Sequence, residues 1–540
     1  MTCETNCTEM NRRNRARARE VTRRRTAFGH YSGVLNGSWY TALFIALTLQ
    51  AVALQPTRAA IPSNSVLDHK ITTAVEDELL FEKSVSPNFI DVTTDKGIVT
   101  LTGTVNDILA KDRAVKIAET IRGVRAVVNR IEVRPTARPD QDIRKGVLAV
   151  LSRDPATEGY QIAVSVTNAV VTLTGTVGSW AEVRLAGEVA KGVTGVKELS
   201  NDLKMHYAVE RPDSAIAADV KARLRWDVWL NNDSINAIVQ DGKVTLTGTV
   251  GSVLEKSRAT GDAWVDGVFS VDATELNVEP WARERWRRQK KFSPTPDSDI
   301  KKAVALAFHY DPRVAAFSPD VRVEDGAVIL SGVVGDLKAK ISAAQDARDV
   351  VGVVSVDNLL KVRRNALPSD AAASQDLKAA LLWDPTLDGT SIESTVIHHV
   401  AYLSGLVDSG LQRQEAQDLA ERTKGVVEVH NHLEVEPTYP IPPLRWPDFE
   451  DRYNWPFGWS QIPPPPLKSD AQIRKDIEKA FFWSPFVDRD DIQLRVRDGV
   501  ATLTGTVEGW VAVKEAQRDA YKGGASFVIN RLHVRKGTWF

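Results

Sequence analysis

One short strand-like segment recurs six times along this chain of 540 residues. The hexapeptide Thr-Leu-Thr-Gly-Thr-Val occurs four times unchanged, and Ile-Leu-Ser-Gly-Val-Val and Tyr-Leu-Ser-Gly-Leu-Val complete the set. The glycines of these segments are Gly103, Gly175, Gly248, Gly332, Gly405 and Gly505, at intervals of 72, 73, 84, 73 and 100 residues. Repetition on this scale predicts a row of small, similar domains, with longer linkers after the third and fifth, rather than one large core.

Two further landmarks keep register with the first in almost every copy. A second glycine follows 19 or 20 residues later, at Gly123, Gly195, Gly267, Gly352, Gly425 and Gly524. An asparagine comes six residues after that, at Asn129, Asn201, Asn358, Asn431 and Asn530, whereas the third copy has Thr274 near this point. We therefore read six copies of one folding unit.

Each copy opens with a helical pattern and continues with a hairpin. Ile143, Val147 and Leu151 lie on one face of a helix, and Asp140 before them is a candidate N-cap. Copies three, four and six repeat this spacing of large apolar residues, beginning at Ile216, Ile300 and Ile473. Copy five has Ala373 in place of the first isoleucine. Asp-Gly pairs such as 241–242 between alternating β-branched runs then predict hairpin turns.

The repeated hexapeptide is the second strand of that hairpin. Alternation places Val99 and Leu101 on the core side, and Gly103 is in phase with them. We expect either that a helix passes too close to Gly103 for a side chain, or that its φ is positive. A glycine that simply ends the strand would show the same pattern. A second amphipathic helix follows, with Gly123 as its expected C-cap and the stripe Ala110, Ala114, Ile117 and Ile121 turned inward. A third strand closes the copy.

This combination of motifs resembles the BON domain, named for bacterial osmotic-stress periplasmic and nodulation proteins. The matching residues are the opening Asp-x-x-Ile pattern, the hexapeptide, and the Gly-Val-x-x-Val-x-Asn segment, seen with Leu for Val at 195–201. The resemblance covers 65–135, 138–207, 211–280, 295–364, 369–437 and 468–537. It implies an α+β tandem array of six αββαβ modules, each a three-stranded mixed sheet with two helices on one face. It also implies an envelope location and a stress role, with no catalytic residues and no cofactor.

The first 60 residues read as an export signal. They carry nine Arg and three Glu, with a basic region over 1–38 and an apolar run over 39–54. The run is short for a spanning helix, so a cleaved signal and a retained N-terminal anchor both remain open. Cys3 and Cys7 are the two cysteines of the chain. Disulfides and cysteine metal sites are therefore excluded from the rest, which we expect in the periplasm or membrane-associated envelope.

The two long linkers differ from the modules in composition. The linker at 281–294 interleaves basic and aromatic residues, including Trp281, Arg285, Trp286, Arg287 and Arg288. Such a segment suits an anionic phospholipid surface, although a solvated helical spacer would look similar. Nucleic acid would suit the same charges, but export argues against it. The linker at 438–467 is rich in proline and aromatic residues and predicts a semi-rigid spacer.

Aromatic residues also end the first helix in several copies, among them Trp226, Trp383 and Trp483. They are candidates for a lipid contact, or else they pack in the core where a following proline stops the helix. His398, His399, His430 and His432 gather in the fifth copy, but without the spacing of a metal site.

The chain therefore reads as a non-enzymatic envelope protein that binds anionic phospholipid or the cell wall through repeated weak modules, since linked weak sites gain avidity. A chaperone-like protector of client proteins under osmotic or envelope stress is the alternative. The oligomeric state and the division of labour among the modules stay open.

Overall fold

The computed structural model describes residues 67–81, 90–154, 156–207, 209–279, 282, 295–363, 367–387, 390–407, 410–435, 468–484, 486–525 and 527–535. The segment predicted as an export signal, the linker at 438–467 and all of the linker at 281–294 except Ala282 lie outside these residues. The described residues form six modules, numbered here in chain order. Among them, no helix is long and apolar enough to cross a membrane.

The first three modules have these elements. Module one contains α2 (Asp68–Phe81), β1 (Ile90–Asp95), β2 (Ile98–Val105), α3 (Ile108–Glu119) and β3 (Ala126–Val133). Module two contains α4 (Asp140–Arg153), β4 (Gln161–Thr167), β5 (Val170–Val177), α5 (Trp180–Lys191) and β6 (Glu198–Met205). Module three contains α6 (Asp213–Trp226), η2 (Asn232–Ser234), β7 (Ile235–Gln240), β8 (Lys243–Val250), α7 (Val253–Asp262), β9 (Ser270–Asp272) and β10 (Leu276–Val278).

The last three modules repeat the order. Module four contains α9 (Asp297–His309), α10 (Pro312–Ala315), β11 (Asp320–Glu324), β12 (Ala327–Ser331), β13 (Val333–Val334), α11 (Leu337–Arg348), β14 (Ser355–Asn358) and β15 (Lys361–Val362). Module five contains α12 (Asp370–Trp383), η5 (Pro385–Leu387), β16 (Ser391–Ile397), β17 (Val400–Val407), α13 (Gly410–Arg422) and β18 (Glu428–Val435). Module six contains α14 (Asp470–Trp483), η8 (Arg489–Asp491), β19 (Ile492–Arg497), β20 (Val500–Val507), α15 (Trp510–Lys522) and β21 (Phe527–Val534).

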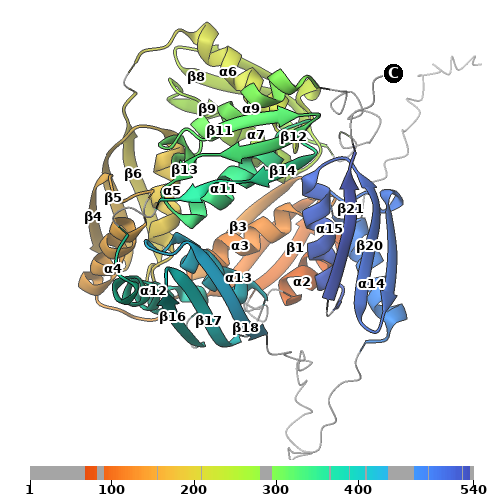
Figure 1. Cartoon of the computed structure of the whole chain (residues 1–540). Helices are drawn as coiled ribbons and strands as arrows, with labels where there is room; N and C mark the ends of the chain where they lie inside the picture. The colour runs from red at the N-terminus through yellow and green to blue at the C-terminus, as the bar shows by residue number, and fades with distance from the viewer. Residues whose placement is uncertain are drawn as a thin grey trace, which may run out of the picture. The chain divides into compact units, whose positions relative to one another are not determined.

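Each module has a mixed sheet with the hexapeptide strand in the centre. In module two, β5 pairs antiparallel with β4 and parallel with β6, in the order β4-β5-β6. The helices α4 and α5 pack on β4 and β6 and on each other, and the blue sixth module in Figure 1 shows the same plan. The αββαβ order and the three-stranded mixed sheets expected from the resemblance are confirmed. Modules three and four depart in detail, because the third strand is interrupted in both and the hexapeptide strand of module four is divided into β12 and β13.

The core of each module lies between its sheet and its two helices. In module two the helix stripe Ile143, Val147 and Leu151 is buried, and so are Val171 and Leu173 of the central strand. Each of the six modules has its own cluster of buried apolar residues. The inward faces predicted for the first helix and the second strand are therefore confirmed.

The second helix of each module approaches the sheet through alanine. In α3 the buried stripe is Ala110, Ala114 and Ala118, whereas Ile117 is only partly buried. The expected stripe is confirmed at Ala110, Ala114 and Ile121, which are buried, and Ile117 packs against the same core. Equivalent buried alanines recur in the other second helices, at Ala186 and Ala190, at Ala259, at Ala339, Ala343 and Ala347, at Ala416 and Ala420, and at Ala516 and Ala520. Small side chains let the helix lie close to the strands.

The glycine of the hexapeptide has a positive φ in all six modules, between 117° and 143°. In module two, a Cβ added to Gly175 would collide with the main-chain oxygen of Gln161 on the neighbouring strand. Of the two causes expected, the positive φ is the one present, and the close neighbour is a strand rather than a helix. An L-residue would be strained here on both counts.

The aspartate that opens the first helix binds the hairpin turn. Asp140 is the first residue of α4, which begins after Pro139, and its carboxylate accepts the N–H groups of Asn168 and Ala169 at 2.8 and 2.9 Å. The expected N-cap role was therefore wrong. The same two bonds, at 2.7 to 3.0 Å, are made in the other modules by Asp68, Asp213, Asp297, Asp370 and Asp470. Both turn residues have positive φ, as type I′ turns require.

The second landmark glycine lies beyond the helix end. The C-cap of α3 is Thr120, three residues before Gly123, so the expected cap position was wrong. In module two, a Cβ on Gly195 would lie 3.2 Å from the side chain of Ile143, the first buried residue of the first helix. The glycine thus allows the turn after the second helix to press against the first helix, with a φ of 97°.

The landmark asparagine joins the third strand to the second helix. Asn201 of β6 donates its side-chain N–H to the main-chain oxygen of Val183 in α5 at 2.8 Å. Asn358, Asn431 and Asn530 make the equivalent bond at 2.7 to 3.0 Å. The third module lacks this asparagine. There, Thr274 instead lies in the break between β9 and β10 and bonds to Asp272.

Candidate functional site

Three tryptophans at the ends of first helices pack against other modules. Trp226 of module three lies against the core of module four, Trp383 of module five against that of module two, and Trp483 of module six against that of module one. All three rings are half-buried. They are therefore occupied by contacts with protein in this structure.

The main chain of each tryptophan makes the same contact. Its carbonyl oxygen accepts an N–H from Val351, Thr194 or Arg122, at 2.9, 2.8 and 3.1 Å respectively. Each donor immediately precedes a second landmark glycine, namely Gly352, Gly195 or Gly123. The turn that those glycines permit therefore presents a main-chain donor to the neighbouring module.

The modules thus pair in nested order, three with four, two with five and one with six. Two of these three pairs join copies that are distant in sequence. The first helices face each other in the inner two pairs, with α6 on α9 and α4 on α12. Each tryptophan ends the first helix of its own module and reaches the turn after the second helix of the other.

Charged and aromatic groups surround the shared contact. In the pair of modules three and four, Arg258 binds the carboxylates of both Asp227 and Asp349. The attraction of these carboxylates outweighs burial and raises the pKa of Arg258. Tyr310 of module four lies against the core of module three, and its hydroxyl accepts the N–H of Asp266, the residue before Gly267. This pair therefore repeats part of its contact in the reverse direction.

The other two pairs are joined by ion pairs at their rims. Lys479 and Lys522 of module six bind Asp77 and Glu78 of module one at 2.6 and 2.7 Å. In the pair of modules two and five, Arg153 binds Asp376 at 3.0 Å. The guanidinium of Arg138 also lies 4.6 Å from the centre of the Trp383 ring. These contacts add charge complementarity to the apolar contact of the tryptophan.

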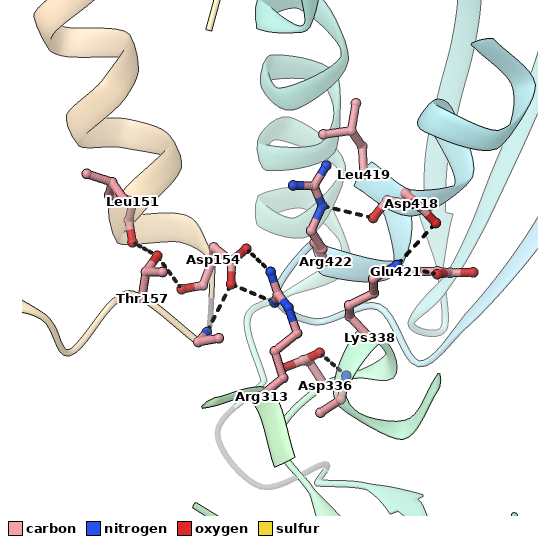
Figure 2. A network of polar contacts seen from close by, with 12 residues as sticks. Leu151, Asp154, Thr157, Arg313, Asp336, Lys338, Asp418, Leu419, Glu421 and Arg422 are labelled. Atoms are coloured by element: carbon pink, nitrogen blue, oxygen red, sulfur yellow. Dashed lines mark hydrogen bonds and ion pairs between the residues drawn. The ribbon is translucent and has the colours of Figure 1, made fainter. Parts of the chain in front are cut away.

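A buried ion pair connects modules two and four (Figure 2). Both terminal nitrogens of Arg313 donate to the two oxygens of Asp154 at 2.9 Å, and the two side chains are 9% and 5% exposed. Asp154 follows α4 and also accepts the N–H of Ala156, while Thr157 donates to Leu151 O. A bidentate, desolvated pair of this kind fixes the register between two surfaces.

A cavity of about 410 Å³ lies beside this ion pair, lined by residues of modules one, two, four and five. Its lining includes eight carboxylates and seven lysine or arginine side chains. Five of those cations have carboxylate partners within 3.2 Å, namely Arg313, Lys338, Arg153, Arg422 and Lys424. The lining is therefore largely neutralised within the protein, which suits a contact between modules better than the capture of a charged ligand.

One wall of the cavity carries a carboxyl with an unusual proton affinity. Asp384, at the end of α12, is 1% exposed. Burial, reinforced by repulsion from Glu415, raises the pKa of Asp384 to about 8 against the attraction of Arg422. Burial likewise raises the pKa of Asp336, on the module-four side, to about 6. The junction therefore holds carboxyls that titrate near neutral pH.

The family model described as "BON domain" matches six segments, 67–135, 139–206, 212–280, 296–364, 369–437 and 469–536. The chain belongs to the BON domain family. Osmotically-inducible protein Y of Escherichia coli (strain K12) is 33% identical over 148 residues, which is 26% of this chain and 74% of that relative.

Two solved structures were also found, both of CdsD, a structural protein of the type III secretion system of Chlamydia trachomatis. The first is 14% identical and covers 36% of this chain and 88% of that chain, with a TM-score of 0.11. The second, its C-terminal domain, is also 14% identical and covers 40% of this chain and all of that chain, with a TM-score of 0.11.

Of the lipid-contact residues predicted from the sequence, the structure describes three. Trp226, Trp383 and Trp483 lie in the contacts between BON modules given above. Trp281, Arg285, Trp286, Arg287 and Arg288 lie outside the described residues.

The histidines of the fifth BON module do not converge. His399 contacts the main-chain oxygen of Gly425 at 3.1 Å, and His430 contacts Glu428 at 2.9 Å. Within the described ranges, no group of three histidine, cysteine or acidic side chains is placed to hold a metal ion.

The pairing of BON modules was missed from the sequence, although one signal for it exists. Tryptophan ends the first helix in modules three, five and six, and the three partners differ at that position. Counted from the opening aspartate, the other three modules have Phe81, Arg153 and Tyr310 at that position. Tryptophan, rather than an aromatic residue in general, therefore marks one module of each pair.

Proposed function

We propose that this chain is a non-catalytic envelope protein that acts in osmotic stress and binds phospholipid or other cell-envelope surfaces through repeated weak contacts. Membership of the BON family and the likeness to Osmotically-inducible protein Y support the stress role. The export signal read from residues 1–60 supports the envelope location.

The observation that carries the proposal is that, within the described residues, the modules contact one another through their helices, which leaves the opposite face of the sheet uncovered by other modules. Modules contact one another through helices, such as α11 with α13, α3 with α7 and α5 with α10. In modules one, three, four and five, the sheet face opposite the helices carries exposed large apolar side chains, at Val128, Ile238, Val333, Ile397 and Leu406. Large exposed apolar residues that recur on one face suit weak contact with another surface.

The linker at 281–294 supplies the electrostatic part of the proposed contact. Its segment from Trp281 to Phe292 carries six basic residues and three aromatic ones. Each lysine or arginine near an anionic membrane contributes about 1 kcal/mol, and the tryptophans suit the interfacial region. Sheet faces and linker on one chain would act together through effective concentration.

Co-sedimentation of the chain from Ile61 to Phe540 with liposomes tests this proposal. Vesicles with 30% anionic lipid should bind the chain, neutral vesicles should bind it weakly, and added salt should release it. The double variant Trp281→Ala and Trp286→Ala should lower binding at least fivefold. Trp446→Ala, in the other linker, is the matched control and should leave binding unchanged. Equal binding to neutral and anionic vesicles at high salt would remove the electrostatic proposal.

A chaperone-like role is the second candidate, favoured by the same exposed apolar side chains on the sheet faces. It predicts that the chain suppresses aggregation of an unfolding client protein at equimolar ratio without lipid. Replacing Ile397 and Leu406 by Ser should weaken that suppression. Lipid binding without any suppression would leave the first proposal alone.

A further inference from the structure

Three pairs of BON modules share one contact, made at matching positions. The tryptophan is the last residue of the first helix each time, and the donor N–H precedes the second landmark glycine each time. A fortuitous contact between two modules would not recur at the same two places in three pairs. We propose that these positions form a recognition surface whose partner is another BON module, so that modules one to three bind modules four to six without needing the covalent link.

The surface has two complementary sides. Modules three, five and six present the tryptophan, and modules four, two and one present the N–H and the apolar wall that receives the ring. Among the described residues, none of the three rings belongs to the core cluster of its own module. The tryptophan therefore serves the contact between modules rather than the fold of the module that carries it.

The nested order divides the chain into two halves. Every pair joins one module before the linker at 281–294 to one module after it. The ion pairs Asp77–Lys479 and Asp376–Arg153 also join the two halves. Other ion pairs join modules within one half, namely Arg125–Glu279, Lys191–Asp112 and Lys338–Asp418. The two halves thus meet through three copies of one surface, each with its own charges to distinguish the correct partner.

Cleavage of the folded chain tests the proposal. A protease recognition sequence inserted after Phe292 allows the intact, folded chain to be cut between modules three and four. Size-exclusion chromatography with light scattering at 1 μM should show the two fragments eluting as one 1:1 complex. Separation of the fragments at this concentration would overturn the proposal.

The tryptophans are then replaced in the same cleavable chain. Trp226→Ala, Trp383→Ala and Trp483→Ala should each weaken the association of the fragments about 30-fold, as central aromatic residues of interfaces do. Phe269→Ala is the matched control, because Phe269 is 63% exposed and should leave the association unchanged. Circular dichroism should show unchanged secondary structure in every variant. Fragments of the triple variant that stay together would also overturn the proposal.

Reversing the charges of one ion pair between modules provides a second test, which does not depend on the folding of a tryptophan variant. Asp77 and Lys479 are both partly exposed, so reversing either charge leaves the module cores intact. Asp77→Lys should weaken association of the fragments, and adding Lys479→Asp should restore it. No recovery in the double variant would contradict the assigned pairing of modules one and six.

Discussion

Gly175 and its five equivalents explain the unchanging glycine of the hexapeptide. A positive φ disfavours a side chain at all six positions, and a strand carbonyl also excludes it at Gly175, Gly248, Gly405 and Gly505, although not at Gly332. Neither cause depends on what the module binds. The repetition of this residue therefore reports a requirement of the fold. The aspartate after the first helix also has a local role, because the Asp384 carboxylate accepts the N–H of Thr386. Asp154, Asp227 and Asp311 make the equivalent bond in their own modules.

Gly175→Ala is expected to destabilise module two by about 3 kcal/mol, since the new Cβ adds a steric clash to an unfavourable φ. Hydrogen exchange of the full chain, followed by mass spectrometry, should show lost protection in β4 and β5. Gly159→Ala is the control, because nothing lies within 4 Å of a Cβ at Gly159. Equal protection in the two variants would contradict the steric explanation.

The buried carboxyls predict how stability changes with pH. Burial is the main reason that the pKa of Asp384 is raised to about 8 and the pKa values of Asp262 and Asp519 to about 7. An aspartate in an unfolded chain has a pKa of about 4, so the folded protein binds these protons more tightly. The resulting stabilisation is complete below about pH 4 and is lost as the pH rises through about 7 to 8.

The melting temperature of the full chain should therefore be higher at pH 6 than at pH 9. Asp384→Asn, which is neutral at every pH, should reduce this difference, and Asp142→Asn on the exposed side of α4 should not. Differential scanning calorimetry at matched ionic strength measures both effects. A melting temperature that rises from pH 6 to pH 9 would show that other groups dominate.

At the scale of elements, one carboxylate connects the first helix of each module to its hairpin. Asp140 lies 28 residues before Asn168, and the same interval separates the aspartate from the first turn residue in every module. In module five, the two main-chain N–H groups lower the pKa of Asp370. A pair of charge-assisted bonds thus holds a turn whose residues both have positive φ.

Asp140→Ala is expected to cost about 2 kcal/mol in module two, because two hydrogen bonds to a charged group are lost. Hydrogen exchange should become faster in the turn at 167–170 while the core of α4 stays protected. Asp142→Ala, two residues along the same helix, is the control. Unchanged exchange in the Asp140 variant would mean that the turn holds its conformation without the helix.

Local periodicity predicted the elements of each module, because burial of Ile143 or Leu173 depends only on alternation within a helix or strand. Contacts across the module were harder to predict. Asp140, which binds the hairpin turn, was predicted to be a helix N-cap. Its constant interval of 28 residues from the hairpin turn could have indicated the true contact. Gly123 was expected to cap α3, but it lies three residues beyond the helix end. The equivalent Gly195 lies against Ile143 of the first helix, and the sequence around the second helix alone does not show that contact. The pattern within one repeat predicts only the elements and core of that repeat. It therefore does not show which two modules pair.

At the scale of the whole molecule, contacts between modules combine half-buried aromatic rings with charges. The Arg313–Asp154 pair is the most enclosed of the ion pairs shown in Figure 2. A buried pair contributes little net stability when intact, but loss of one partner leaves a charge without compensation. This pair therefore disfavours any arrangement of modules two and four in which Arg313 and Asp154 do not meet.

Arg313→Ala is expected to weaken the contact between these modules by about 3 kcal/mol, because the Asp154 carboxylate stays buried and unpaired. Faster hydrogen exchange should appear at the ends of α4 and α10 together. The double variant Arg313→Met with Asp154→Asn should recover most of the loss, since no buried charge remains. A single variant as stable as the original chain would show that water already reaches the pair.

The nested order of the pairs also determines when each pair can form while the chain is being synthesised. Modules three and four can dock as soon as both have emerged, whereas module one must wait for module six, the last to appear. Its receiving surface is thus left uncovered for longer than any other while the chain is being made. A chain truncated before module six would leave the receiving surface of module one without its partner. Loss of the last module would therefore expose a surface on the first.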